Sequence, residues 1–168
     1  MRRAARLPGG FTLIELLVTI AVAALLGMLV VPNLVSMVQS GKTSVLVNKF
    51  PQDVAWARNL AVTSQHPVQI ALSNGNCQWI ATVNGGPAVA EHSLTNAATQ
   101  YPGVTCTITT NAPTTGNLDF NSQGFITDGV GGPPISPTIT VSTANGQQTW
   151  TMQVLSSGSV ILNSNTAS

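Results

Sequence analysis

Residues 11–31, FTLIELLVTIAVAALLGMLVV, form an unbroken apolar stretch that contains a single charged residue, Glu15. As an α-helix, these 21 residues would extend about 31 Å, close to the roughly 30 Å hydrocarbon core of a bilayer. The preceding residues 1–10, MRRAARLPGG, carry three arginines. Because flanking positive charge is retained in the cytoplasm, we expect one membrane-spanning helix with its C-terminal side facing outward.

Two ordinary interpretations of this segment leave Glu15 unexplained. A secretory signal peptide would have a charged start, an apolar region and a small-residue cleavage site, for which residues 21–23, Ala-Val-Ala, are suitable. Such peptides avoid charge in the apolar region, however, and here the apolar run continues to Val31. A plain membrane anchor would carry the carboxylate at a cost of about 2.5–3.5 kcal/mol at the membrane centre. An acid in this position therefore requires a functional partner.

The stretch GFTLIE at residues 10–15 resembles the type III signal of type IV prepilins, in which a short basic leader precedes this pattern and an apolar helix. The resemblance implies that a prepilin peptidase removes residues 1–10 by cutting between Gly10 and Phe11. It also implies that the new amine of Phe11 is methylated and that Glu15 serves filament assembly.

Charge pairing gives a physical reason for Glu15. Cleavage after Gly10 would create an ammonium group on Phe11, one helical turn away from Glu15. Unpaired charge is costly in a bundle of low dielectric constant, so the Glu15 carboxylate and the Phe11 amine of a neighbouring subunit would stabilise each other. This pair would set the axial register of adjacent subunits, while residues 16–31 pack as the filament core.

Residues 32–65 are expected to continue the helix as an amphipathic second half. Pro32 should bend the helix axis, at a position that resembles the kink of pilin helices. Further along, apolar residues recur in steps of three and four, which predicts one buried face. They are Val47, Phe50, Val54, Ala57 and Ala61. Because Pro67 restricts the residue before it, the helix should end by Gln65.

Pro51 interrupts this apolar stripe. Proline lacks an amide hydrogen and clashes with the preceding turn, so we expect a second kink or a new helix start there. Asp53 would then lie near a helix N-terminus, where the helix dipole favours a carboxylate.

Residues 66–168 are expected to form a β-rich periplasmic domain. Seven segments are rich in Val, Ile, Thr and aromatic residues and are bounded by Gly, Asn and Pro. They are residues 68–73, 77–83, 104–109, 117–120, 138–142, 148–155 and 159–163. Residues 74–76 and 145–146 fit tight turns. The predicted fold class is α+β: the pilin fold, with a long N-terminal helix, transmembrane in its first half, packed against a C-terminal antiparallel β-sheet.

A second resemblance covers nearly the whole chain. Residues 53–61, DVAWARNLA, followed by a strand that starts at residues 67–68, are similar to the GspH/FimT group of minor pilins, as are residues 118–124, LDFNSQG, and the strand after Gly158. The group implies a low-copy subunit near the filament tip that supports assembly or initiation of a type IV pilus. A minor pseudopilin of the type II secretion system is the alternative, and a surface-binding pilin for adhesion or DNA uptake is a further one.

The charge distribution argues against nucleic acid as a direct ligand. Without residues 1–10, three basic and five acidic side chains remain, a net charge of −2, and no Lys or Arg follows Arg58. Members of the group that bind DNA carry arginines in a glycine-led motif near the C-terminus. The matching residues 158–161 are Gly-Ser-Val-Ile, so we do not expect direct DNA binding.

Cys77 and Cys106 are the only cysteines. In an exported domain such a pair predicts one disulfide, which would contribute about 3–4 kcal/mol by closing its loop; two free thiols are the alternative in a reducing compartment. His66 and His92 lack the spacing of metal ligands. We interpret His92 and Glu91 as a solvated loop pair.

The sequence contains no GxSxG motif and no glycine-rich phosphate loop, so we expect no enzymatic activity, no metal and no cofactor. Trp56, Trp79 and Trp150 are interpreted as core residues, with an exposed aromatic patch at Trp79 or Trp150 as the alternative. The expected partners are a prepilin peptidase, other pilins or pseudopilins, an inner-membrane assembly platform and membrane lipid. The expected location is the inner membrane, as a single-pass protein with a cytoplasmic N-terminus and a periplasmic C-terminal domain, and then the pilus or pseudopilus.

Overall fold

A computed structural model describes residues 11–73, 77–109, 116–129, 132–143 and 148–166 of the chain. The chain divides after Val38 into two compact units. One long helix, α1 (Leu13–Ser64), begins in the first unit and ends in the second. The sheets lie in the second unit, so the two parts of α1 have different surroundings.

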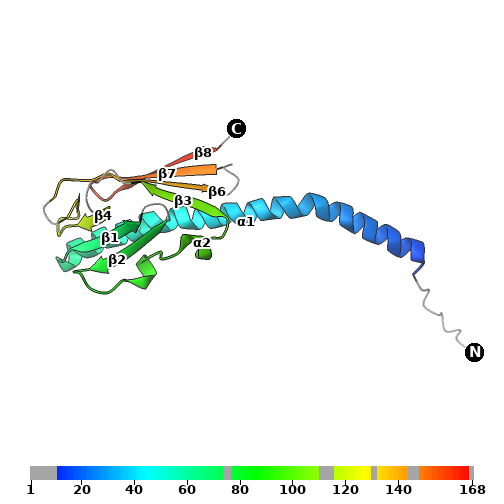
Figure 1. Cartoon of the computed structure of the whole chain (residues 1–168), viewed down its shortest axis with the longest axis horizontal. Coiled ribbons are helices and arrows are strands. Elements are labelled where there is room, and N and C mark those ends of the chain that lie inside the picture. The colour runs from blue at the N-terminus through cyan, green and yellow to red at the C-terminus, as the bar shows by residue number, and fades with distance from the viewer. Residues whose placement is uncertain (1–10, 74–76, 110–115, 130–131, 144–147, 167–168) are drawn as a thin grey trace, which may run out of the picture. The chain divides into compact units, whose positions relative to one another are not determined.

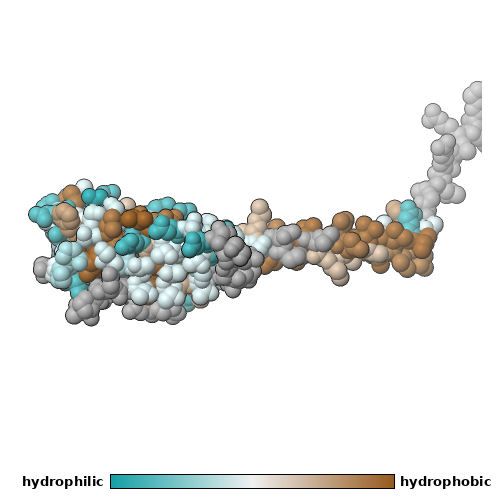
Figure 2. Space-filling view, turned by 90° about the horizontal axis from the view of Figure 1, so that it is seen from above, coloured by the Kyte–Doolittle hydropathy of each residue, from teal (hydrophilic) through white to brown (hydrophobic). Residues whose placement is uncertain are grey.

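In the first unit, α1 exposes its apolar side chains, and Figure 2 shows this part of the helix as almost uniformly hydrophobic. The large apolar side chains that the structure describes between residues 11 and 31 are 52% to 81% exposed. They are Phe11, Leu13, Ile14, Leu16, Leu17, Val18, Ile20, Val22, Leu25, Leu26, Met28, Val30 and Val31. Over the described residues, no helix combines the length and the apolar character needed to cross a membrane.

α1 remains helical through both of its prolines. Of the two outcomes predicted at Pro51, the new helix start is therefore wrong, and the second kink stays a prediction. Phe50 and Val54, on either side of Pro51, are both fully buried, and this packing outweighs the hydrogen bond that proline cannot make. The bend at Pro32 stays a prediction.

The end of α1 agrees with the sequence, which predicts a stop by Gln65. Gln65 has a φ of 56°, in the left-handed region, and its Nε2 donates a hydrogen bond to the carbonyl of Val62 at 2.7 Å. This bond satisfies one of the carbonyl groups left open at a helix C-terminus. Strand β1 (Val68–Ser73) begins directly after Pro67.

The predicted apolar face of the helix is buried in the second unit. Its five residues are each at most 2% exposed: Val47, Phe50, Val54, Ala57 and Ala61. Leu46 is fully buried beside them, and all six belong to one core cluster with residues of both sheets. The amphipathic prediction for this half of the helix is confirmed.

The described residues form two antiparallel sheets of four strands each (Figure 1). The first has the order β2-β1-β4-β5 and the second the order β3-β6-β7-β8. Beyond β1, the strands are β2 (Gln78–Val83), β3 (Val104–Thr109), β4 (Asn117–Phe120), β5 (Ile126–Thr127), β6 (Thr138–Thr143), β7 (Gln148–Val154) and β8 (Val160–Thr166). The α+β class with antiparallel strands is confirmed, and all seven predicted segments correspond to strands.

Three short elements were not predicted: β5, the 3₁₀-helix η1 (Ala90–His92) and α2 (Ala97–Gln100). A strand of two residues has no alternation to detect, and β5 forms because the turn before it is held by one side chain. Asn121 Oδ1 accepts hydrogen bonds from the backbone N–H groups of Gln123 and Phe125 at 3.0 and 2.9 Å. The turns predicted at residues 74–76 and 145–146 lie outside the described residues.

Candidate assembly site and buried ionic cluster

Thr12 caps the start of α1. Its Oγ1 accepts a hydrogen bond from the backbone N–H of Glu15 at 3.3 Å, and its carbonyl accepts one from Leu16 N at 3.1 Å. Thr12 and Glu15 therefore have the spacing of a Thr-x-x-Glu capping box, in which a carboxylate in the first turn also complements the helix dipole. Thr12 is thus the residue that caps the helix, which the Thr-x-x-Glu pattern could have revealed, and Glu15 contributes its backbone N–H to this cap.

The predicted processing and assembly residues lie at the start of the first unit. Gly10 is outside the described residues, so cleavage between Gly10 and Phe11 stays a prediction. Phe11 precedes the cap and is 81% exposed, and Glu15 is exposed as well. The predicted site residues are divided between the two units: Phe11 and Glu15 belong to the first, and the two cysteines belong to the second.

A buried carboxylate, Asp53, lies on the inner face of α1 in the second unit. It is 2% exposed and sits within the helix, not near a helix start as predicted. The indole Nε1–H of Trp79 donates a hydrogen bond to Asp53 Oδ2 at 2.7 Å, and Nδ1 of His92 lies 3.0 Å from Oδ1. The ammonium of Lys49, one turn earlier, is 3.1 Å from Oδ2. These three partners offset the cost of burying the charge.

His92 is held on two sides. Its ring stacks on the indole of Trp56, with centroids 3.9 Å apart and an interplanar angle of 13°, while Nδ1 contacts Asp53. The Lys49 ammonium also donates a hydrogen bond to the backbone carbonyl of Glu91 at 2.8 Å. The prediction of a solvated pair between the side chains of Glu91 and His92 is therefore wrong. Asp53 and His92 are 39 positions apart, so no local pattern relates them.

We call these residues, Lys49, Asp53, Trp56, Trp79 and His92, the Asp53 cluster. α1 supplies three of them, β2 supplies Trp79 and η1 supplies His92. The near-complete burial of Asp53 leaves almost no surface for a substrate. The role of the cluster is therefore structural: it holds α1, β2 and η1 together. One signal was available in the sequence: Asp53 follows Phe50 by three positions and therefore lies on the apolar stripe.

The tryptophans belong to the core, as predicted. Trp79 is 1% exposed, and Trp56 and Trp150 are partly buried and pack against the core cluster. The alternative of an exposed aromatic patch is therefore wrong for Trp79.

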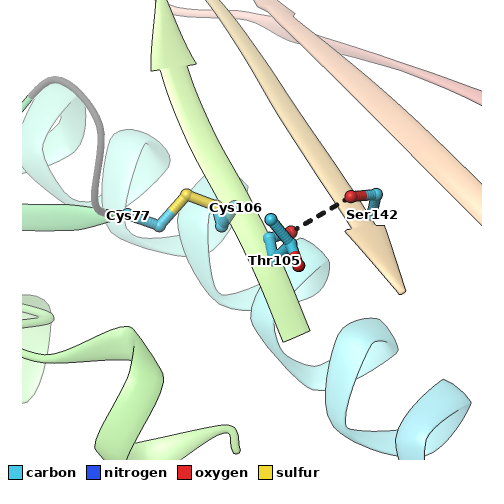
Figure 3. Close-up of a disulfide and its surroundings, with 4 residues drawn as sticks. All are labelled: Cys77, Thr105, Cys106 and Ser142. Atoms are coloured by element: carbon cyan, nitrogen blue, oxygen red, sulfur yellow. Dashed lines mark hydrogen bonds between the residues drawn. A yellow bond between two sulfur atoms is a disulfide. The ribbon is translucent and has the colours of Figure 1, made fainter. Parts of the chain in front are cut away.

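The predicted disulfide between Cys77 and Cys106 is present (Figure 3). The two Cα atoms are 5.2 Å apart, and both residues are at most 9% exposed. Cys77 directly precedes β2 and Cys106 lies in β3, so the bond joins the two sheets. Beside it, the Ser142 hydroxyl donates a hydrogen bond to the carbonyl of Thr105 at 3.4 Å, between β6 and β3.

A groove of about 430 Å³ opens next to the disulfide. It is lined by Cys77, Gln78, Asn96, Ala97, Ala98, Val104, Thr105 and Cys106. None of these side chains carries a charge, so the groove offers hydrogen bonds and no ionic contact to a ligand. In the part of the chain that the structure describes, no group of three or more His, Cys, Asp or Glu side chains could hold a metal ion.

A capped apolar helix that becomes amphipathic and packs beneath antiparallel sheets is the architecture of a pilin-like filament subunit. Residues 46–158 match the family model described as type II transport protein GspH. This match covers more than half of the chain, so the chain belongs to that family. No curated protein and no solved structure matches the chain.

The family consists of structural pilin or pseudopilin components, not of enzymes, and its members associate with other pilins or pseudopilins in a filament. The match begins at Leu46, a fully buried residue of the helix, and does not include the motif at residues 10–15. Family membership and the N-terminal motif are therefore independent observations.

Proposed function

We propose that this chain is a minor pilin that is incorporated into a type IV pilus and supports its assembly or initiation. The observation that carries the proposal is the stretch GFTLIE at residues 10–15, which leads into a helix whose described large apolar side chains up to Val31 are 52% to 81% exposed. Packing these side chains against the helices of neighbouring subunits would remove a large apolar surface from water. Membership of the GspH family supports the role of a filament subunit.

Processing and location form part of the same proposal. A prepilin peptidase removes residues 1–10 and the amine of Phe11 is methylated, after which an inner-membrane assembly platform transfers the subunit into the filament. Before transfer, the protein is a single-pass protein of the inner membrane with a cytoplasmic N-terminus and a periplasmic C-terminal domain. Because no described helix is long and apolar enough to cross a membrane, insertion rests on the sequence of residues 11–31 and on the three arginines before it.

Glu15 guides assembly in this proposal. Its carboxylate pairs with the Phe11 amine of an adjacent subunit, since both charges would be costly if they were buried alone. The exposure of both residues in the single chain supports such a pair between subunits. The hydrogen bond from the Glu15 backbone N–H to Thr12 is separate, because it lies within one helix and does not involve the carboxylate.

The second candidate function is that of a minor pseudopilin of the type II secretion system. The description of the matching family, type II transport protein GspH, favours it. Deleting the gene distinguishes the two: loss of surface pili supports the pilus, whereas loss of secreted enzymes with normal pili supports the pseudopilus.

Intact-mass analysis of the protein, extracted from membranes with and without prepilin peptidase, tests the processing. We expect the peptidase to remove residues 1–10 and to leave one additional methyl group on Phe11. A mature protein that starts at Ala24, or that retains residues 1–10, would overturn the proposal.

Substitution of Glu15 tests its role in assembly. Glu15→Gln retains the hydrogen-bonding capacity of the capping box but removes the charge, so we expect normal cleavage and a strong loss of the protein from sheared filaments. Thr19→Val is the matched control, because it removes an exposed polar group from the same helix without changing charge. Equal incorporation of both variants would contradict the ion pair.

A further inference from the structure

Two turns from different sheets close on the side chain of Arg58. One turn ends at Gly124 and leads from β4 to β5, and the other ends at Gly158 and leads from β7 to β8. A Cβ atom placed on Gly124 would lie 3.2 Å from Cγ and 3.3 Å from Nε of Arg58. A Cβ atom placed on Gly158 would lie 2.9 Å from Cδ of the same side chain. The aliphatic stem of Arg58 therefore fills the space that both glycines leave.

Both glycines have backbone conformations that disfavour any other residue. The φ angle is 82° at Gly124 and 76° at Gly158, in the region where a Cβ atom strains the backbone. At each position a side chain is therefore disfavoured for two reasons: the φ angle is positive, and Arg58 lies too close. The two turns hold the Arg58 stem in a defined path.

The guanidinium group at the end of this stem has no partner within the part of the chain that the structure describes. Arg58 is exposed, and the two ion pairs of the described residues both involve Asp53. The Asp119 carboxylate is occupied by Gln69 Nε2 at 2.6 Å and by the backbone N–H of Gly129 at 3.0 Å. The guanidinium is a planar group of N–H donors on an exposed residue, and its geometry matches the two oxygens of a carboxylate.

Apolar side chains flank the arginine. Val62, one turn further along α1, is 41% exposed, and its Cγ2 lies 3.0 Å from the Cβ position of Gly124. Phe125, the next residue after Gly124, is 51% exposed. An arginine together with an aromatic side chain is typical of residues that contribute most to protein interfaces.

We propose that Arg58, Val62, Gly124, Phe125 and Gly158, the Arg58 patch, form a docking surface for a carboxylate side chain with apolar neighbours on another pilin or pseudopilin subunit. This inference rests on the proposed function, because it places the partner in the same filament. A protein carboxylate suits the patch better than nucleic acid, since residues 59–168 contain no second Lys or Arg to contact further phosphates. The exposed apolar side chains also match a protein surface.

Photo-crosslinking in cells that assemble the filament tests this surface. The full-length protein carries p-benzoylphenylalanine in place of Phe125, and sheared filaments are irradiated and analysed by mass spectrometry. We expect adducts with a peptide of another pilin or pseudopilin that contains Asp or Glu. The same probe in place of Ile80, which is 39% exposed on β2, is the control and should not label that peptide.

Charge variants then test the role of Arg58 itself. In Arg58→Gln we expect the adduct yield per incorporated subunit to fall about tenfold, as for the loss of one charged hydrogen-bonded pair, whereas Lys42→Gln should leave it unchanged. Arg58→Glu combined with an Arg at the labelled acid should restore the yield. If Arg58→Gln does not reach the filament, Arg58→Lys is used in its place. This variant keeps the charge but not the planar guanidinium, so its adduct yield should fall less.

The outcomes separate the two proposals. Wild-type protein that never enters sheared filaments overturns the proposed function. Normal incorporation without an adduct at Phe125, adducts only with nucleic acid or lipid, or an unchanged yield in Arg58→Gln overturns the Arg58 patch alone.

Discussion

The indole N–H of Trp79 donates a hydrogen bond to Asp53 Oδ2 at 2.7 Å, although 26 positions separate the two residues. Both residues are at most 2% exposed. The Trp79 ring also meets the ring of Phe50 edge-on, with centroids 5.1 Å apart. One directional bond and one aromatic contact therefore fix β2 against α1, since a shift of either element would leave the buried indole N–H without its acceptor and remove one of the three partners of the Asp53 carboxylate.

Replacing the buried carboxylate should destabilise the second unit. In Asp53→Asn the amide oxygen can still accept hydrogen bonds, but the NH₂ group replaces the other carboxylate oxygen. It would face either the Trp79 N–H and the Lys49 ammonium, or the ring of His92. We expect the free energy of unfolding to fall by about 2–4 kcal/mol. Urea unfolding followed by tryptophan fluorescence measures this change.

Glu91→Gln is the matched control for that experiment. It makes the same carboxylate-to-amide change at an exposed residue that contributes only its backbone carbonyl to Lys49. We expect a change within about 0.5 kcal/mol. An equal loss of unfolding free energy in the two variants would show that the Asp53 cluster does not specifically stabilise the fold.

Removing the disulfide should lower stability without changing the fold. In the double variant Cys77→Ser with Cys106→Ser, the unfolded chain regains the freedom of a closed loop whose ends are 29 positions apart. We expect a loss of about 3–4 kcal/mol in the free energy of unfolding. Dithiothreitol should lower the stability of the wild-type protein and not of the variant; a wild-type protein indifferent to the reductant would contradict this.

The approach of Arg58 to Gly158 can be measured by a matched pair of glycine substitutions. Gly85 has a φ of 69° and no heavy atom within 4 Å of its Cβ position, so Gly85→Ala should cost only the backbone strain of about 1 kcal/mol. Gly158→Ala adds a clash with Arg58 Cδ at 2.9 Å and a tight contact with Phe120 Cε1 at 3.3 Å, and should cost about 2–3 kcal/mol.

Combining Gly158→Ala with Arg58→Ala completes a double-mutant cycle. Without the arginine stem, the alanine at position 158 should cost less than in the wild-type background but more than at Gly85, because the contact with Phe120 remains. Thermal unfolding of the four proteins gives the coupling. Strictly additive effects would place Arg58 away from the Gly158 turn.

Processing should depend on the residue before the cut. Gly10→Val should block removal of residues 1–10, because the prepilin resemblance implies that the peptidase requires glycine there. Intact mass should then show the uncleaved, unmethylated chain. Gly9→Ala is the control and should be processed normally; cleavage of Gly10→Val would contradict the assigned site.

Much of the fold could be predicted from local patterns. The stripe from Val47 to Ala61 and the β-branched segments each define an element and its buried face, because side-chain direction follows from helix and strand periodicity. The apolar run of residues 11–31 defines a helix, whose described large apolar side chains are exposed in the single chain. The helix start predicted at Pro51 was wrong, because the local effect of proline is weaker than the burial of Phe50 and Val54 on either side. The disulfide was predictable because only one pair of cysteines exists.

The candidate sites also differ in how far the sequence alone reveals them. Glu15 stands out in the sequence because a charge interrupts an apolar helix, and no packing is needed to notice it. Packing alone decided that Asp53 is buried against Trp79 and His92, that the strands divide into two sheets, and that Arg58 passes between two glycine turns. These relationships join residues far apart in the chain, and only the mutual fit of helix and sheets determines which polar groups meet.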